Sequence, residues 1–267
     1  LDLIDGLRRE QGITAIIISH KLNEIAYSAD AVQVIRDGRT ISHIDIDAAH
    51  PLDQDVLIRD MVGRPLTNRY PVHTSRIGKE MFRIEDWRMR HPLDEARLVS
   101  KDVSINVFGR QYGTNASGRI FVEGKEVKFP TVRSAIDHGV AYATEDRKVY
   151  GLNLMKTIRE NTSLASLREL SNRLGVVDET REKRTAEKYR KEFRTKAPTI
   201  EMPAGNLSGG SQQKVVLAKW MATDPKVLIL DEPTRGIDVG AKYDIYEIID
   251  QLADSGSAVV VISSELP

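Results

Sequence analysis

Three short segments decide how this chain folds: LSGGSQQK at residues 207–214, VLILDEP at 227–233 and TRGID at 234–238. Between the first and the second lies an apolar stretch with helical spacing, which Asp224 and Pro225 end. The four apolar residues before Asp-Glu-Pro indicate a strand buried on both faces, as in a parallel sheet. The chain therefore places a helix start, a buried strand and a carboxylate pair in close succession.

The residue types suit a site for an anionic ligand. Ser208 is a good N-cap, and Gly209 and Gly210 let a ligand approach a helix start whose free N–H groups attract anions. Asp231 and Glu232 fall at the carboxyl end of the strand, where open α/β sheets bind their ligands. One carboxylate holding Mg²⁺ and a second polarising a water is what phosphoryl transfer requires. A capped helix and a carboxylate pair without any task remain the alternative.

In order and spacing, the three segments resemble the signature motif, Walker B motif and D-loop of ABC transporter ATPases. The resemblance implies ATP and Mg²⁺ as cofactors. It implies Asp231 as the metal residue and Glu232 as the catalytic base. It also implies the following nucleotide-binding residues: Ser208, Gly209, Gly210, Gln212 and Asp238.

The composition sets outer bounds on the function. The chain has 267 residues, of which 40% are hydrophobic, enough for one large domain or two smaller ones. Lys plus Arg equals Asp plus Glu at 39 each, so no global field draws the protein to nucleic acid or lipid. No cysteine is present, which excludes disulfides and thiol chemistry. No apolar run approaches the length of a membrane span. The first residue, Leu1, is not a methionine, and we expect the chain to be cut at both ends.

The chain contains an internal repeat. Residues 1–22 align without a gap to residues 245–266, with identical residues that include Gly12 with Gly256 and Ser19 with Ser263. Each copy predicts an amphipathic helix, a glycine stop and a buried strand. The repeat suggests two tandem copies of one domain.

The resulting fold prediction is an α/β, P-loop NTPase-like ABC ATPase domain, with a parallel sheet, an antiparallel β subdomain and a helical subdomain. The carboxyl-terminal end of a first such domain precedes it. Buried strands are predicted at 13–19, 227–231 and 257–263. The predicted divisions are the end of a first domain at 1–63, a linker at 64–79 and a second domain at 80–267, with its helical subdomain at about 157–205.

Smaller elements follow from local patterns. A hairpin is expected over 30–44, a helix over 51–63, antiparallel strands over 81–87 and 98–107, a hairpin over 121–129 and a helix over 134–138. By the resemblance, Trp87 or His91 is a candidate to stack on adenine. Residues 168–196 carry ten Lys and Arg with six interleaved acids, which favours a solvated helix face over a nucleic-acid patch.

Further resemblances narrow the family. Glu145 stands at the Q-loop position, in the segment 139–148, where most ABC domains carry glutamine. His20 falls at the position of the catalytic switch histidine, whereas Ser264 stands opposite it in the repeat. With the linker at 63–71, these features resemble the tandem ATP-binding subunit of bacterial ribose, xylose and galactose-type importers. This resemblance implies membrane permease subunits as partners, a periplasmic sugar-binding protein as an indirect one, no nucleic acid, and a peripheral place on the cytoplasmic face of the inner membrane.

One departure from the family stands out. No Gly-x-x-x-x-Gly-Lys-Ser/Thr, the Walker A phosphate loop, occurs anywhere. We infer that roughly twenty residues are absent between Val107 and Phe108. Residues 113–120 have the glycine spacing, with Arg119 for lysine, but a strand is predicted after them. They are interpreted as a glycine-rich turn before a hairpin.

In the family's head-to-tail dimer, His20 and the 207–212 segment would face one composite site, while Glu145, Asp231 and Glu232 would face another. This chain then holds parts of both and neither in full. We therefore expect it to be an incomplete, inactive piece of a sugar-importer ATPase. Two alternatives are a non-catalytic module that binds a permease, which co-purification without ATPase activity would favour, and a soluble ABC protein of DNA repair or translation, which failure to bind nucleic acid would dismiss.

Overall fold

The computed structural model describes residues 1–36, 38–47, 50–63, 71, 73–74, 77–91, 94–101 and 114–264. The chain divides into two compact units. The first consists of Leu1–Val72 with Asp238–Asp244, and the second of His73–Ile237 with Ile245–Pro267. No described helix is both long and apolar enough to cross a membrane.

The first unit is built around a hairpin. Its elements are α1 (Asp2–Gln11), α2 (Leu22–Ser28), β1 (Ala31–Arg36), β2 (Arg39–Asp45) and α3 (Gln54–Val62). β1 and β2 pair antiparallel, which confirms the predicted hairpin, and α3 packs against β1. Among the described residues of this unit, the buried hydrophobic side chains are Val34, Leu57 and Ile58.

The ends of α3 show why the predicted helix forms. The carboxylate of Asp53 accepts hydrogen bonds from the backbone N–H groups of Asp55 and Val56, which would otherwise lack partners. At the other end Gly63 adopts a left-handed conformation, with φ of 87°, which glycine reaches without a steric penalty. Both signals are local, and both lie within the predicted range of 51–63.

The predicted buried strand over residues 13–19 is wrong. These residues form neither helix nor strand, and Ile16 and Ile18 are 92% and 100% exposed. A strand needs the backbone of a neighbour to satisfy its N–H and C=O groups. Among the described residues no strand pairs with this segment. Its apolar sequence alone does not make it a strand.

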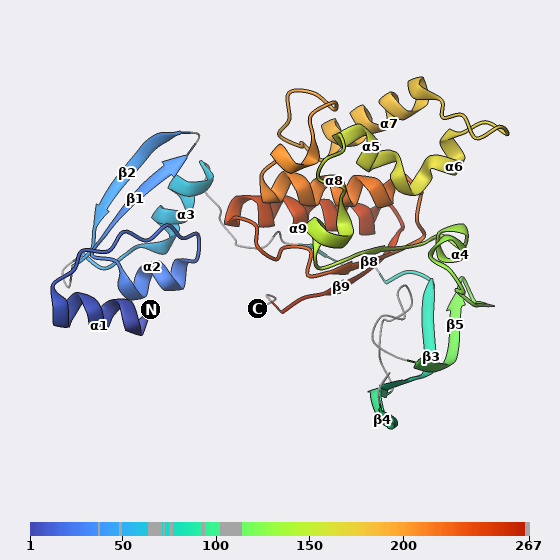
Figure 1. Cartoon of the computed structure of the whole chain (residues 1–267), viewed down its shortest axis with the longest axis horizontal. Helices are drawn as coiled ribbons and strands as arrows, with labels where there is room; N and C mark the ends of the chain where they lie inside the picture. The colour runs from blue at the N-terminus through green and yellow to red at the C-terminus, as the bar shows by residue number, and fades with distance from the viewer. Residues whose placement is uncertain are drawn as a thin grey trace. The chain divides into compact units, whose positions relative to one another are not determined.

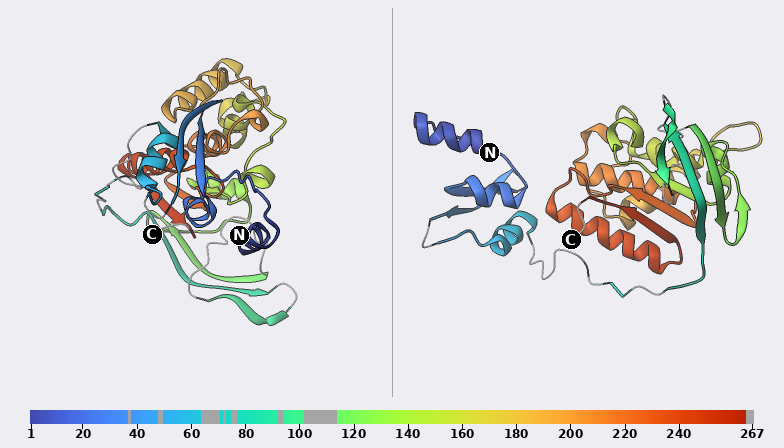
Figure 2. Two further views of the ribbon diagram at one scale, coloured as in Figure 1. Left: turned by 90° about the vertical axis from the view of Figure 1, so that its left-hand side faces the viewer. Right: turned by 90° about the horizontal axis from the view of Figure 1, so that it is seen from below.

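The second unit begins with an antiparallel sheet in the order β4-β3-β5-β6, comprising β3 (Phe82–His91), β4 (Asp94–Lys101), β5 (Thr114–Val122) and β6 (Lys125–Val127). Figure 2 shows the long strands β3 and β5 side by side. The predicted strands at 81–87 and 98–107 are present with shifted limits, although 102–107 lie outside the described residues, as do the side chains of Trp87 and His91.

The interpretation of residues 113–120 as a turn is also corrected. From Thr114 onward these residues belong to β5, which pairs with β3 through Glu85 and Arg119. The chain then turns at Glu123 and Gly124 into β6. Because no helix begins after the glycines, their amides cannot converge on a phosphate.

A parallel sheet lies at the centre of the second unit, in the order β7-β8-β9. It consists of β7 (Val140–Ala143), β8 (Val227–Asp231) and β9 (Ala258–Ile262), which confirms the strands predicted at 227–231 and 257–263. β8 has a neighbour on each side, and its residues Val227 to Leu230 are fully buried. α4 (Val132–Asp137) packs against β7, and one apolar cluster that includes Val122 and Ile229 joins the two sheets.

The helix α8 (Gly209–Met221) lies between the parallel sheet and a helical layer (Figure 1). It contacts β7 as well as α5 (Ile158–Ser163) and α7 (Glu179–Glu192). Its residues from Gly210 to Lys219 are all buried, as expected of a helix covered on every side. The remaining elements are η1 (Arg147–Gly151, a π-helix), the 3₁₀ turns η2 (Leu164–Ser166) and η3 (Ala204–Asn206), α6 (Leu167–Leu170) and α9 (Val239–Asp254).

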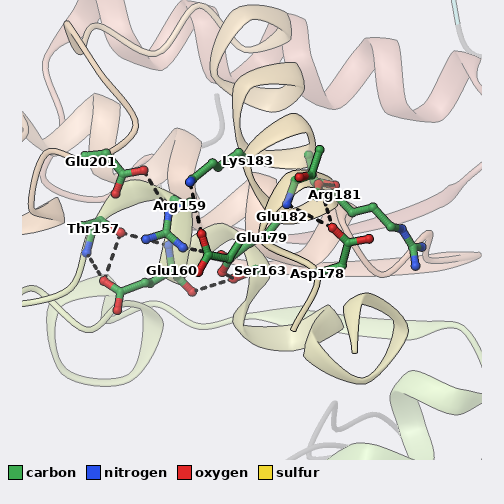
Figure 3. Close-up of polar contacts among 12 residues, drawn as sticks. Thr157, Arg159, Glu160, Ser163, Asp178, Glu179, Arg181, Glu182, Lys183 and Glu201 are labelled. Carbon is green, nitrogen blue, oxygen red and sulfur yellow. Dashed lines mark hydrogen bonds and ion pairs between the residues drawn. The ribbon is translucent and has the colours of Figure 1, made fainter. Parts of the chain in front are cut away.

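A polar network holds α5 to α7 (Figure 3). The guanidinium of Arg159 pairs with Glu182, which is only 5% exposed, and with Glu201 at 2.9 Å. The hydroxyl of Ser163 donates to the other oxygen of Glu182 at 2.6 Å. At its start α7 is capped by Asp178. The charged composition of this region is therefore partly an internal network and partly an exposed face.

Candidate functional site

Two parallel strands end at the same edge of the sheet and bring the predicted carboxylates together. Ala143 of β7 lies opposite Leu230 of β8 in the register. Glu145 lies just after β7, and Asp231 and Glu232 lie at the end of β8, so the three residues meet at one edge. This edge is where open α/β sheets bind ligands.

Asp231 has a partner that the sequence did not reveal. The hydroxyl of Tyr142, on the neighbouring strand β7, donates a hydrogen bond to its carboxylate at 2.8 Å. Burial raises the pKa of Asp231, and the negative charges of Glu145 and Glu232 raise it further, while the Tyr142 bond acts in the opposite direction. The protein thus leaves the negative charge at Asp231 incompletely compensated. A bound cation would supply that compensation.

Glu232 is held in an unusual backbone conformation. Its φ of 45° lies in the left-handed region, which is uncommon for a residue with a side chain. The backbone N–H of Glu232 donates to the carbonyl of Ile262 on β9 at 2.8 Å. Such outliers persist where the surrounding structure fixes them, often at functional sites.

The carboxylate of Glu232 is oriented by the segment that follows β9. One of its oxygens accepts a hydrogen bond from the backbone N–H of Ser264 at 2.8 Å. The other oxygen is buried and has no protein partner among the described residues. A water molecule is the ligand that such an oxygen would accept from. Ser264, which stands opposite His20 in the repeat, therefore contacts Glu232 through its backbone.

The start of α8 has the predicted cap. The hydroxyl of Ser208 accepts from the backbone N–H of Ser211 at 3.4 Å, and Gly209 and Gly210 form the first turn. Gln212, predicted to bind nucleotide, is buried, and its amide donates to the carbonyls of Ala204 and Leu207 at 3.2 Å each. This side chain supports the loop before the helix, whereas Ser208 is exposed.

The two remaining predicted site residues belong to the first unit. His20 is exposed, and it follows the 13–19 segment that forms no strand. Asp238 accepts from the backbone N–H of Ala241 at 2.9 Å, close to the start of α9. The structure thus gathers Glu145, Asp231 and Glu232 at one edge, and it places His20 and Asp238 in the other unit.

Two contacts at this site escaped the sequence reasoning. Tyr142 and Ser264 are separated from the carboxylates they contact by 89 and 32 residues. The sequence signal for these two contacts was indirect: parallel strands place the residues at their carboxyl ends along a common edge of the sheet. No group of three or more His, Cys, Asp or Glu side chains suited to a metal is found within the described residues.

Comparison with known families gives a match to the ABC transporter family model over residues 103–235. The chain is 45% identical to the L-arabinose transport ATP-binding protein AraG of Geobacillus stearothermophilus over 97% of its length. It is 42% identical to the xylose import ATP-binding protein XylG of Geobacillus kaustophilus over 97% of its length. The chain spans about half the length of these relatives, 55% in both cases.

The match to XylG of Escherichia coli K12 includes a length difference. It is 37% identical over 290 aligned residues and covers 100% of this chain and 56% of the relative. Because the chain has only 267 residues, 23 of the aligned positions lack a counterpart in it.

Solved structures share the fold at lower identity. A nucleotide-free ATP-binding cassette from an ABC transporter superposes with a TM-score of 0.56 at 20% identity, over 70% of this chain and 83% of that one. A dimeric post-hydrolysis cassette, MJ0796 with ADP and Pi bound, superposes with a TM-score of 0.55 at 17% identity, over 69% and 88%.

Proposed function

Since this chain belongs to the ABC transporter family of ATP-binding proteins, we propose that it is part of a subunit that couples ATP hydrolysis to monosaccharide uptake. The observation that carries this proposal is the state of Glu232. Its carboxylate is fixed on one side by Ser264 and keeps a buried oxygen that has no partner in the described part of the chain, beside Asp231. This is the arrangement that a general base for water requires. The related importer subunits named for arabinose and xylose support a sugar as the cargo.

The family binds ATP, in general with Mg²⁺. Asp231 suits the role of metal residue, because Mg²⁺ is commonly held by one or two carboxylates together with phosphates and waters. When bound, the ion would neutralise developing charge on the phosphates. Glu232 would take the proton of the attacking water, and Glu145 would line the same edge. Ser208, Gly209, Gly210 and Gln212 would serve the nucleotide held by another domain.

His20 and Asp238 belong to the proposal as well. We propose that His20 serves the composite site that also uses the 207–212 segment, and that Asp238 contributes from the D-loop. The proposed domain plan is unchanged: the end of a first ATPase domain at 1–63, a linker at 64–79 and a second domain at 80–267. The permease partner and the cytoplasmic face of the membrane belong to the same proposal.

The missing phosphate loop limits what the chain does by itself. The 23 aligned positions without a counterpart support the proposal that a segment is absent between Val107 and Phe108, both of which lie outside the described residues. Without backbone amides and a lysine to cradle the phosphates, we expect no tight ATP binding.

Titration calorimetry with MgATP tests this expectation. The purified 267-residue chain should give no heat of micromolar binding. A matched variant that carries the corresponding AraG segment between Val107 and Phe108 should bind in the micromolar range. Micromolar binding by the unmodified chain would refute the missing-loop proposal. A well-folded restored variant that still fails to bind would refute the assignment of the site.

A second candidate function has a specific observation in its favour. The chain lacks the phosphate loop, while the helices α5 and α7 of the helical layer are present and joined by the bonds of Arg159 and Ser163 to Glu182. A non-catalytic module that binds a permease would need only that layer. Co-purification with the permease, without ATPase activity even after restoration of the loop, would favour this function over the first.

A further inference from the structure

Arg147 connects three segments of the candidate site. It is the first residue of the π-helix η1 and follows Glu145 and Asp146 directly. One terminal nitrogen of its guanidinium donates to the carbonyl of Arg235 at 2.8 Å, and the other donates to the carbonyl of Gly236 at 3.1 Å. The segment after β7 is thereby fastened to the segment after β8.

The start of α8 approaches the same guanidinium. A Cβ atom on Gly209 would lie 2.8 Å from the Nη2 atom of Arg147 and 3.3 Å from the carbonyl oxygen of Gly236. Real Cβ atoms do not come so close to other atoms, so only glycine fits here while the Arg147 bonds persist. Gly209, the third residue of the LSGG segment, is therefore constrained by Arg147 as well as by any ligand.

The backbone that carries Arg147 is fixed at both ends of η1. The carboxylate of Asp146 accepts from the N–H groups of Lys148 and Val149 at 3.0 Å each. At the other end the ammonium group of Lys219, on α8, donates to the carbonyl of Gly151 at 2.5 Å. Short π-helical turns occur frequently at functional sites. The position of the Arg147 side chain is thus determined by the fold on both sides.

Burial disfavours the positive charge of Arg147. Burial lowers the pKa of this guanidinium, while the neighbouring charge of Asp146 acts in the opposite direction. Its Nε atom is buried without a partner among the described residues. It also lies near the start of α8, whose free N–H groups carry partial positive charge.

We infer that Arg147 is a positioning residue that holds residues 235–237 at a fixed distance from the start of α8. Displacement of the Glu145 segment then moves residues 235–237 and the start of α8 together. Arg147 acts through the backbone carbonyls of Arg235 and Gly236. The functional roles of these segments rest on the proposed function. The coupling between the segments is a property of the 267-residue chain without nucleotide.

Hydrogen exchange and NMR on the unmodified chain and three variants test this inference. In Arg147→Gln, the amide of Arg235 should exchange about tenfold faster, because the hydrogen bonds to the carbonyls of residues 235 and 236 are lost. The amide of Ser211 should also exchange faster, because the guanidinium that lies beside Gly209 is removed. The backbone carbonyl ¹³C resonances of Arg235 and Gly236 should move upfield. Exchange in β8 and α7 should stay unchanged. Arg147→Lys, which keeps the charge and one donor group, should restore part of both signals.

Lys148→Gln is the matched control, because it removes the same charge one residue later from an exposed side chain. It should leave the carbonyl resonances and the exchange rates as they are. If Arg147→Gln leaves the two carbonyl resonances in place, or if it accelerates exchange equally in α7 and β8, the inference is overturned. Neither result depends on ATP, so failure here is distinct from failure of the proposed function.

Discussion

The two copies of the internal repeat share a sequence pattern but differ in structure. Each copy forms its helix, α1 in the first and α9 in the second, and each helix is followed by a glycine in a left-handed conformation, Gly12 at φ 66° and Gly256 at φ 99°. After the glycine the copies diverge. Residues 258–262 form β9, whereas residues 13–19 form no strand.

The difference lies in the neighbouring strand. β9 pairs in parallel with β8 from Ala258 to Ile262, and this pairing satisfies one edge of its backbone. Among the described strands none runs beside residues 13–19. A run of β-branched residues therefore supplies the capacity to form a strand, and a neighbouring strand decides whether it does so. The isoleucines at 13 and 16–18 of the first copy remain exposed as a result.

Truncating one isoleucine in each region tests most directly whether the two regions differ in packing. Ile229 on β8 is 0% exposed and Ile16 is 92% exposed. We expect Ile229→Ala to lower the free energy of unfolding of the second unit by about 4 kcal/mol, because it removes buried surface and leaves a cavity. Ile16→Ala should change the stability of the first unit by less than about 0.5 kcal/mol.

Urea titration measures both values. Tryptophan fluorescence follows the second unit alone, because Trp87 and Trp220 both belong to it, and circular dichroism follows the whole chain. A loss of more than about 2 kcal/mol for Ile16→Ala would show that residues 13–19 are packed in solution.

The sequence predicted best what depends on near neighbours in the chain. The cap at Ser208 acts on an N–H group three residues away, so residue type and position are sufficient to find it. β8 was predictable because an unbroken apolar run suits a strand buried on both faces. The parallel sheet followed from the alternation of such runs with helices.

What the sequence did not reveal depends on contacts between distant segments. The bond from Tyr142 to Asp231, the bond from Ser264 to Glu232 and the bridge made by Arg147 each join segments that only the folded sheet brings together. The error over residues 13–19 has the same origin. Apolar patterning describes what a segment can bury, not whether a partner is present to bury it.

A second prediction compares a buried lysine with an exposed one. Burial lowers the pKa of Lys219 on α8 to about 8, whereas the bond to Glu24 raises the pKa of the exposed Lys21 above its ordinary value. Between pH 8 and 10.5 the unfolded chain binds the Lys219 proton and the folded chain does not. The stability of the second unit should therefore rise over this window, by about 3 kcal/mol at most.

Lys21 behaves in the opposite sense. Its contribution to stability is fully present below its unfolded pKa and is lost only as pH rises through its raised folded pKa. Unfolding curves recorded from pH 7 to 11 measure both effects. Lys219→Met should abolish the rise in the tryptophan-detected transition, and Lys21→Met should leave it intact. A rise that persists in Lys219→Met would assign it to another group.

The prediction with the smallest expected effect compares one ion pair in the first unit with one in the second. Glu182 is nearly buried and accepts from both Arg159 and Ser163, whereas the pair between Arg8 and Asp30 is solvent-exposed, with 79% of the Asp30 side chain accessible. Glu182→Gln keeps the shape but removes the charge that strengthens these hydrogen bonds, and it should cost about 2 kcal/mol. Asp30→Asn should cost less than about 0.5 kcal/mol, because water screens an exposed pair. Urea titration in low and high salt separates the two cases, since salt weakens exposed pairs far more than buried ones. Equal costs for both variants would mean that the network in the second unit is open to water, and that the contrast between the two units is confined to their strands.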